Sequence, residues 1–294
     1  KQTQLFDAMI TVLGQQRPKE HQTAPLVTRH VLSELKRQEM CLLLAEDNPV
    51  NRKLAITLLA RMGYSVDAVE DGQQAVDAVQ KRSYNLILMD VQMPEMDGFE
   101  ATRHIRALPG KISRIPIVAM TAHAMKGDRE RCLAAGMDDY VSKPFEPKEL
   151  AEVIQRWTEQ TPAEPPDPEA SAAPAAPPDS PFRVDLALPR FGDDYGFFLE
   201  MLGEFVAHLP DRVTALKAAL AGGDAYTLAR HGHNLKGVAA NFSALQLTEL
   251  ALSLEMLGKE AQLDQAATLV EAIEAEIARV CAAYESLKAA PVPA

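Results

Sequence analysis

An aspartate, Asp90, ends one of the most apolar segments of the sequence, Leu86–Met89. Four apolar residues followed by a loop that contains proline and glycine are typical of a strand buried on both faces of a parallel sheet. The carboxyl ends of the strands in an open α/β sheet form the edge where ligands bind. We therefore expect Asp90 at such an edge, where its carboxylate could accept a phosphoryl group.

Two acidic residues follow another predicted strand, and they should meet Asp90 at the same edge. These residues are Glu46 and Asp47. Hard oxygen ligands suit Mg²⁺, which binds few protein carboxylates and keeps some of its water. We expect Asp47 and Asp90 to bind Mg²⁺ directly and Glu46 to bind it directly or through water. The main-chain carbonyl of Gln92 would be a further ligand.

Two more side chains at strand ends could contact the phosphoryl oxygens. Lys143 offers an ammonium group and Thr121 offers a hydroxyl group. An aspartate at the end of a strand is by itself usually a turn residue, and a single threonine or lysine indicates nothing. Five such residues at the ends of four predicted strands favour phosphoryl chemistry. The Lys143-Pro144 bond is a candidate cis peptide, which would fix the direction of the lysine.

A second candidate centre is His233, which lies inside a predicted helix. At 100° per residue, His233 is roughly 140° from the centre of the apolar stripe, so we expect it to face water. The stripe consists of Leu228, Leu235, Ala239 and Phe242. His231 falls on the flank of that stripe, which favours a packed structural residue over a metal-binding histidine pair.

The neighbours of His233 suit a nucleophile. Lys236 adds a cation beside any phosphate, and Gly237 costs about 1 kcal/mol relative to alanine inside a helix. The missing side chain would let a flat partner surface approach the imidazole, which is a nitrogen nucleophile near pH 7 when neutral. An exposed structural histidine is the plain alternative.

Short apolar runs alternate with amphipathic helices between residues 41 and 158, as βαβ units require. The predicted fold is a doubly wound α/β domain of flavodoxin-like type with five parallel strands. The predicted strands are Cys41–Ala45, Ser65–Val69, Leu86–Asp90, Pro116–Thr121 and Asp139–Ser142. The predicted helices are Asn51–Met62, Gly72–Lys81, Phe99–Leu108, Gly127–Ala135 and one after Pro147.

The rest of the chain divides into shorter segments and one helical domain. Residues 159–182 are expected to be an extended linker, because Thr161 to Pro181 contains eight prolines, six alanines, four acids and no base. Residues 183–288 have helical periodicity and predict a four-helix bundle. Residues 1–14 could be the last helix of a truncated preceding domain, residues 15–40 a connector and residues 289–294 a tail. The bundle helices are expected at Phe197–Leu209, Val213–Ala221, Ala225–Phe242, Ala244–Leu257 and Leu263–Leu287.

Composition excludes several classes of function. The 294 residues are 47% hydrophobic with a net charge of -11, which suits two globular domains and disfavours nucleic acid or an anionic membrane as partner. The three cysteines lie far apart, as in reduced cytosolic proteins. No apolar stretch has the length that a membrane span needs, so we expect a cytoplasmic segment without membrane contact.

The motifs around the first centre resemble those of two-component receiver domains over about residues 40–158. The matching motifs are Ala45-Glu46-Asp47-Asn48, Leu88-Met89-Asp90-Val91-Gln92-Met93-Pro94, Met120-Thr121-Ala122 and Ser142-Lys143-Pro144-Phe145. The resemblance implies that Asp90 is the phosphoacceptor, that Glu46 and Asp47 are the acid pair and that Lys143 contacts the phosphate. It also implies that Thr121 and Tyr140 form a switch, although Tyr140 could equally be a core aromatic residue.

The segment His233-Asn234-Leu235-Lys236-Gly237 resembles the histidine phosphotransfer (HPt) domain, here over about residues 183–288. This resemblance implies that His233 is phosphorylated and that Lys236 assists it, with a supporting role for Asn241. The family has no ATP site of its own.

Together the two resemblances predict a phosphorelay segment of a hybrid sensor histidine kinase. Asp90 would accept a phosphoryl group from an upstream histidine kinase domain, and His233 would relay it to a separate response regulator. Because the chain begins with Lys1, the kinase domains and any membrane anchor of the parent would lie upstream. A non-catalytic adaptor, whose receiver is only a phosphorylation-dependent binding switch, is the alternative.

Overall fold

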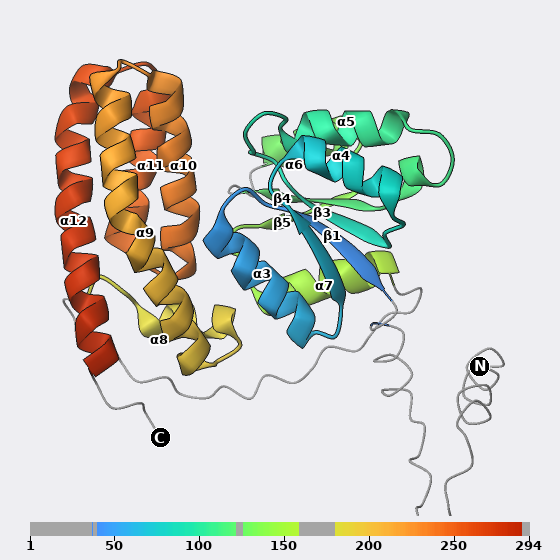
Figure 1. The fold of residues 1–294 in the computed structure, drawn as a ribbon, viewed down its shortest axis with the longest axis horizontal. Coiled ribbons are helices and arrows are strands. Elements are labelled where there is room, and N and C mark those ends of the chain that lie inside the picture. Colours follow the sequence, from blue (N-terminus) through green and yellow to red (C-terminus); the bar gives the residue numbers. More distant parts are fainter. Residues whose placement is uncertain (1–36, 38–39, 122–125, 159–179, 290–294) are drawn as a thin grey trace, which may run out of the picture.

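The computed structural model describes residues 37, 40–121, 126–158 and 180–289, which form two domains (Figure 1). The first is an α/β domain and the second is helical. The predictions for residues 1–14, for most of the connector 15–40 and of the linker 159–182, and for all but the first residue of the tail 289–294 lie outside these residues. Among the described residues, no helix is both long enough and apolar enough to cross a membrane.

The α/β domain has one sheet of five parallel strands in the order β2-β1-β3-β4-β5. The predicted doubly wound fold is confirmed, and the one difference in strand bounds is that β4 begins at Ile117 instead of Pro116. The strands are β1 (Cys41–Ala45), β2 (Ser65–Val69), β3 (Leu86–Asp90), β4 (Ile117–Thr121) and β5 (Asp139–Ser142).

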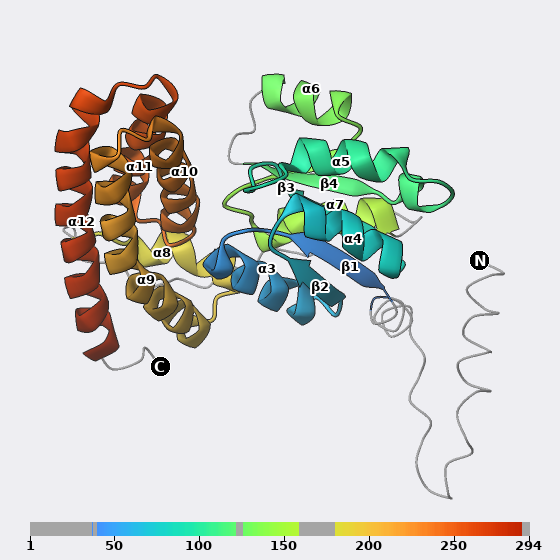
Figure 2. The same cartoon turned by 45° about the horizontal axis from the view of Figure 1, so that its top comes forward.

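Helices cover both faces of this sheet, as Figures 1 and 2 show. Helices α4, α5 and α6 pack on one face, and α3 and α7 pack on the other. Every residue of β1, β3 and β4 is buried, because both faces of these strands are covered. The helices are α3 (Pro49–Arg61), α4 (Gly72–Lys81), α5 (Gly98–Ala107), α6 (Lys126–Ala134) and α7 (Pro147–Thr158), and a short 3-10 helix η1 (Ile112–Arg114) precedes β4.

The helical domain is built on four long helices that pack around a single apolar core. The four helices are α9 (Tyr195–Ala221), α10 (Ala225–Asn241), α11 (Leu245–Lys259) and α12 (Leu263–Ala289). A short helix α8 (Val184–Ala187) and a 3-10 helix η2 (Leu188–Phe191) precede them.

Two sequence expectations in this domain are wrong. The two predicted helices 197–209 and 213–221 are one helix, α9, which continues through Pro210. A proline inside a helix costs about 3 kcal/mol, but Leu209 and Leu216 on either side of it are both buried in the core. The second error concerns Phe182, which was expected to be the last residue of the linker 159–182. Its ring is fully buried with the helical domain, so the packed domain already includes this residue.

Helix α3 belongs to both cores. Ala55 and Leu59 pack against the sheet of their own domain. Val50, Leu54 and Leu58 lie on another face of α3 and pack in the core of the helical domain instead. The two domains therefore meet along α3, and Figure 2 shows this helix beside the bundle.

Candidate functional site

The carboxylates predicted from the sequence meet at the carboxyl edge of the sheet. Glu46 and Asp47 follow β1, and Asp90 is the last residue of β3. Each offers a carboxylate oxygen, and these oxygens lie within 4.8 Å of one another. Among the described residues this is the one acidic group of three or more with metal-ligand geometry. The parallel topology brings the three side chains together.

Lys143 lies between two of these acids. Its Nζ is 2.6 Å from Asp90 Oδ2 and 2.5 Å from Glu46 Oε2, and all three side chains are buried. Burial alone would lower the pKa of Lys143, but its ion pairs with Asp90 and Glu46 raise this pKa overall. The Lys143-Pro144 peptide is cis, as predicted.

The cluster holds more negative than positive charge. Burial raises the pKa of Asp90, and its neighbours Glu46 and Asp47 add to this effect, while the ion pair with Lys143 opposes it. Burial and Glu46 likewise raise the pKa of Asp47. Three carboxylates therefore share one ammonium group, which leaves this edge of the sheet able to attract a cation.

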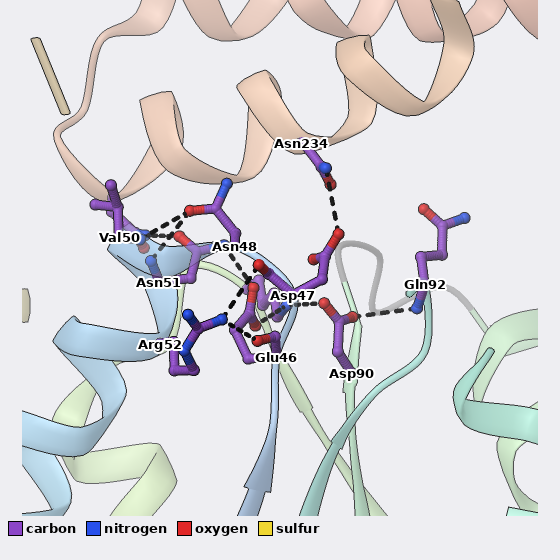
Figure 3. A network of polar contacts seen from close by, with 11 residues as sticks. Glu46, Asp47, Asn48, Val50, Asn51, Arg52, Asp90, Gln92 and Asn234 are labelled. Carbon is purple, nitrogen blue, oxygen red and sulfur yellow. Dashed lines mark hydrogen bonds and ion pairs between the residues drawn. The ribbon is translucent and has the colours of Figure 1, made fainter. Parts of the chain in front are cut away.

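The first turn of α3 holds in place the loop that carries Glu46 and Asp47 (Figure 3). The Asn48 side chain caps the helix by accepting from the main-chain N–H of Val50 and of Asn51. Arg52 Nη1 donates to the main-chain oxygens of Glu46 at 2.9 Å and Asp47 at 3.2 Å. The role of Arg52 was missed by sequence reasoning, although its position one turn after the cap Asn48 was a signal.

The remaining receiver-side candidates lie in different places. Thr121 is buried at the end of β4 and lines a cavity with Asp90. The main-chain nitrogen of Gln92 faces Asp90 and donates to Oδ1 at 3.2 Å, as Figure 3 shows. Tyr140 is partly buried against the apolar core of its domain. It is not among the residues that line the cavity.

His233 lies on α10, and its environment differs from the prediction. We expected it to face water, but only 15% of its side chain is exposed. The Nδ1 atom is 3.2 Å from Oε1 of Glu255, a buried residue of α11. The expectation was wrong because the helical wheel describes one helix, whereas the neighbouring α11 and the first domain cover this part of α10. His231 is half-buried, as expected, and burial lowers its pKa.

Glu255 is the centre of a compact charge network. Lys236 Nζ donates to its Oε2 at 2.7 Å, and Lys259 Nζ donates to its Oε1 at 2.6 Å. Burial would raise the pKa of Glu255, but the hydrogen bonds from His233, Lys236 and Lys259 lower it well below its usual range. Lys236 is thus buried and ion-paired in this structure. Sequence reasoning missed Glu255, because nothing nearby in the sequence links it to His233.

Two glycines near His233 allow close approaches. A Cβ at Gly232 would lie 2.7 Å from the main-chain nitrogen of Glu255, so this glycine lets α10 and α11 meet closely. A Cβ at Gly237 would lie 3.7 Å from Asn51 Nδ2 of α3. The prediction that a partner surface comes close to Gly237 agrees with this contact.

Polar contacts join the two centres across the domain boundary. Asn234 Nδ2 donates to Asp47 Oδ2 at 3.4 Å (Figure 3). Asn241 Nδ2 donates to Asn51 Oδ1 at 2.9 Å, and Asn51 Nδ2 donates to Glu46 Oε1 at 3.1 Å. A buried chain of hydrogen bonds therefore runs from α10 to the acid cluster.

A cavity of about 560 Å³ lies between the two domains and contains both centres in its walls. The residues from the two centres that line it are Asp47, Asp90, Thr121, His233, Asn234 and Glu255. His233 and Asp90 thus both line the same cavity.

Comparisons with known families agree with this division into two domains. Residues 42–155 match the family described as the response regulator receiver domain. Residues 200–283 match the family described as the Hpt domain. The chain contains a receiver domain and an HPt domain. Both are domains of phosphorelay systems.

The curated relatives are longer sensor proteins and kinases. Sensor protein GacS of Pseudomonas syringae pv. syringae is 38% identical over 224 residues, which are 74% of this chain and 24% of the relative. The histidine-protein kinase BarA of Escherichia coli K12 is 42% identical over 118 residues, which are 40% of this chain and 13% of BarA. The chain thus spans about a quarter or less of the length of these relatives.

A solved structure similar to the receiver domain is that of the sensor histidine kinase PA1611 from Pseudomonas aeruginosa PAO1. It is 49% identical, covers 40% of this chain and 97% of its own, and has a TM-score of 0.39. That receiver domain was crystallised with a magnesium ion coordinated in the active site cleft.

Proposed function

We propose that this chain exchanges a phosphoryl group between Asp90 of the receiver domain and His233 of the HPt domain. The observation that supports this most is the shared cavity, which both Asp90 and His233 line. Phosphoryl transfer needs the two reacting groups in line, and catalysis is mostly positional and electrostatic. A docked pair of domains supplies that positioning.

Glu255 determines which nitrogen of His233 can react. A carboxylate oxygen only accepts hydrogen bonds, so the ring nitrogen beside it, Nδ1, carries the proton in the neutral imidazole. The lone pair on Nε2 is then free to attack phosphorus. As the N–P bond forms, the bond from phosphorus to the Asp90 oxygen breaks, and its electron pair returns to the carboxylate. The reverse sequence phosphorylates Asp90.

The acid cluster fits a divalent cation, because three carboxylates surround a single ammonium group. We propose Mg²⁺, held by Asp47 and Asp90, with Glu46 binding directly or through water and the Gln92 carbonyl as a further ligand. When bound, the ion would withdraw charge from the phosphoryl group and screen the carboxylates from it.

The other candidate residues of the two domains have supporting roles. Lys143 would release one carboxylate and pair with a phosphoryl oxygen, and the Thr121 hydroxyl would bond another. Lys236 holds Glu255 in position, which is the role that its observed ion pair supports. The switch formed by Thr121 and Tyr140 stays a prediction.

The relatives indicate the wider pathway. They are sensor proteins and histidine kinases of which this chain matches only a part. We propose that the parent protein is a hybrid histidine kinase, that its kinase domain supplies the phosphoryl group and that His233 passes it to the receiver domain of a separate response regulator.

The test is to incubate the chain with Mg²⁺ and a small acyl phosphate and to map the bound phosphate by its chemical stability. Phosphohistidine is labile in acid and stable in base, whereas an aspartyl phosphate is also labile in base. We expect both species in the parent sequence, neither with Asp90→Asn, and only the aspartyl phosphate with His233→Gln.

The result that would contradict the proposal is phosphate that stays on Asp90 and never reaches His233. That result would instead favour the non-catalytic adaptor. Direct labelling of His233 in the Asp90→Asn variant would also contradict it, because the histidine would then not need the receiver domain.

A further inference from the structure

The HPt domain contacts the receiver domain chiefly through α3. Val50, Leu54 and Leu58 follow one another at four-residue spacing, so they form a single stripe along this helix. All three are buried in the core of the HPt domain. An apolar stripe of this kind supplies area, but many helices could offer it, so it does not by itself select a partner.

A buried amide pair fixes the register of this contact. Asn51 of α3 accepts from Asn241 of α10, and both side chains are at least 95% buried, with exposures of 4% and 3%. A buried polar group without its partner is costly. Sliding α3 along the HPt domain would break the pair, so the pair determines which residues of α3 face which residues of the bundle.

In that register, basic residues of α3 meet acidic residues of α9 and its N-cap residue Asp194. Lys53 Nζ lies 2.9 Å from Glu200 Oε1, and it also pairs with Oε1 of Glu204. At the other end of α3, Arg61 Nη2 lies 2.7 Å from Asp194 Oδ2. We call Asp194, Glu200 and Glu204 the acidic strip of the HPt domain.

We propose that the acidic strip selects the receiver domains that dock on the HPt domain. The selected partner is a receiver whose first helix presents a basic side chain at the position of Lys53. The inference rests on the proposed function and extends it from this chain's own receiver to the separate receiver that takes the phosphoryl group from His233. Both receivers must reach the same imidazole, so both must use this face in turn.

The strip suits recognition better than stability. Lys53 and Glu204 are each 39% exposed, and Glu200 is 60% exposed. Exposed ion pairs add little to stability. Complementary charges at a rim nevertheless speed association and reject partners of like charge. A partner with an acidic residue opposite the strip would therefore be rejected.

The first experiment uses the full chain and follows the formation of phosphohistidine after addition of Mg²⁺ and a small acyl phosphate. We expect Lys53→Glu to slow this transfer about tenfold at low salt, because it faces two glutamates. The total phosphate taken up by Asp90 should not change. The triple variant Lys53→Glu with Glu200→Lys and Glu204→Lys should recover most of the rate. Lys81→Glu, on the exposed end of α4, is the control of equal net charge.

Salt gives an independent readout. The Debye length falls from about 10 Å at 0.1 M to about 3 Å at 1 M salt, so exposed pairs are screened. We expect the difference between the parent sequence and Lys53→Glu to shrink to about twofold or less in 1 M salt. A purely structural defect in α3 would not be corrected by salt.

The second experiment tests docking of a separate receiver, with a second copy of this chain as the probe. One chain carries His233→Gln and supplies the phosphorylated receiver, while the other carries Asp90→Asn and supplies the histidine. Lys53→Glu in the first chain should slow transfer between chains, because its receiver docks poorly. The same substitution in the second chain should speed transfer, because it weakens the receiver that already covers His233.

The possible outcomes separate this inference from the proposed function. If no chain forms phosphohistidine, including the parent sequence, the proposed function is wrong. If the parent sequence transfers normally but Lys53→Glu behaves like Lys81→Glu, the acidic strip does not select receivers. A Lys53→Glu effect of the same sign in both chains of the second experiment would also overturn the inference.

Discussion

The two centres that face the cavity are built in opposite ways. Around Asp90, one cation lies among three acids. Around His233, one acid, Glu255, receives hydrogen bonds from the imidazole and from Lys236 and Lys259. The first centre therefore has an excess of negative charge, and the second is rich in basic groups. This difference suits an exchange in which the acidic centre needs a cation and the basic centre can approach a phosphoryl anion.

The two centres also differ in how the chain assembles them. Lys143 is 53 residues from Asp90 and 97 from Glu46 in the sequence, so the sheet must form before they meet. Glu255 is only 22 residues from His233, on the next helix. We expect changes at the first centre to disturb the whole receiver domain and changes at the second to act on the pair α10 and α11.

Replacement of Lys143 should have the largest effect. Lys143→Met leaves Glu46 and Asp90 buried without their common partner, which typically costs 3–5 kcal/mol, so we expect a loss of about that size in the free energy of unfolding. Phosphate uptake by Asp90 should fall at least about a hundredfold. Denaturant unfolding and labelling with a small acyl phosphate measure the two effects. Lys148→Met, at an exposed position of α7, is the matched control, and equal behaviour of the two variants would contradict the arrangement described.

Replacing each of the two glycines of α10 with alanine should change stability differently, with a loss at Gly232 and none at Gly237. Gly232→Ala places a Cβ 2.7 Å from the main chain of α11, which we expect to cost about 1–3 kcal/mol in stability. Gly237→Ala meets only the Asn51 side chain at 3.7 Å. It should be neutral or stabilise the helix by up to about 1 kcal/mol. Thermal unfolding compares them, and a larger loss with Gly237→Ala would show that the packing of α10 is different.

Glu255→Gln should have a smaller effect on stability and a clear effect on His233. The amide oxygen can still accept from Nδ1, but Lys236 loses a buried ionic partner, so we expect a loss of about 1–3 kcal/mol. Transfer to His233 should slow by about tenfold, because a neutral amide makes a weaker hydrogen bond to the imidazole than a carboxylate does. Receiver labelling should be unchanged. Unaltered transfer would show that Glu255 does not position the imidazole.

The pH dependence of stability should show the smallest effect. Because the pKa of Glu255 in the folded protein lies below its ordinary value of 4.5, its charge stabilises the fold above about pH 4.5. This contribution is lost as the pH falls further, when the carboxylate gains a proton. The stability difference between the parent sequence and Glu255→Gln should therefore be constant near neutral pH and shrink below pH 4.5. Urea unfolding at several pH values measures it, and a difference that grows on acidification would contradict the depressed pKa.

Much of the receiver domain was predictable because its signals are local. Runs such as Leu86–Met89 are apolar throughout because both faces of a central parallel strand are buried, and this pattern locates the strand within a residue or two. Polar residues at the ends of such runs must then converge, because parallel strands end at one edge. The sequence and that rule alone predict the grouping of Glu46, Asp47, Asp90 and Lys143, and the structure brings these side chains together.

The sequence by itself thus determined the elements, the sheet edge and the two candidate centres, because hydrophobic period and strand ends are properties of contiguous residues. Only the tertiary structure decided which residues cover His233, which acid forms a hydrogen bond with its Nδ1, and that α3 packs in two hydrophobic cores. The same holds for the continuous α9 through Pro210 and for the burial of Phe182. These features depend on how one surface packs against another, and no periodicity within a single segment records which surface its partner will be.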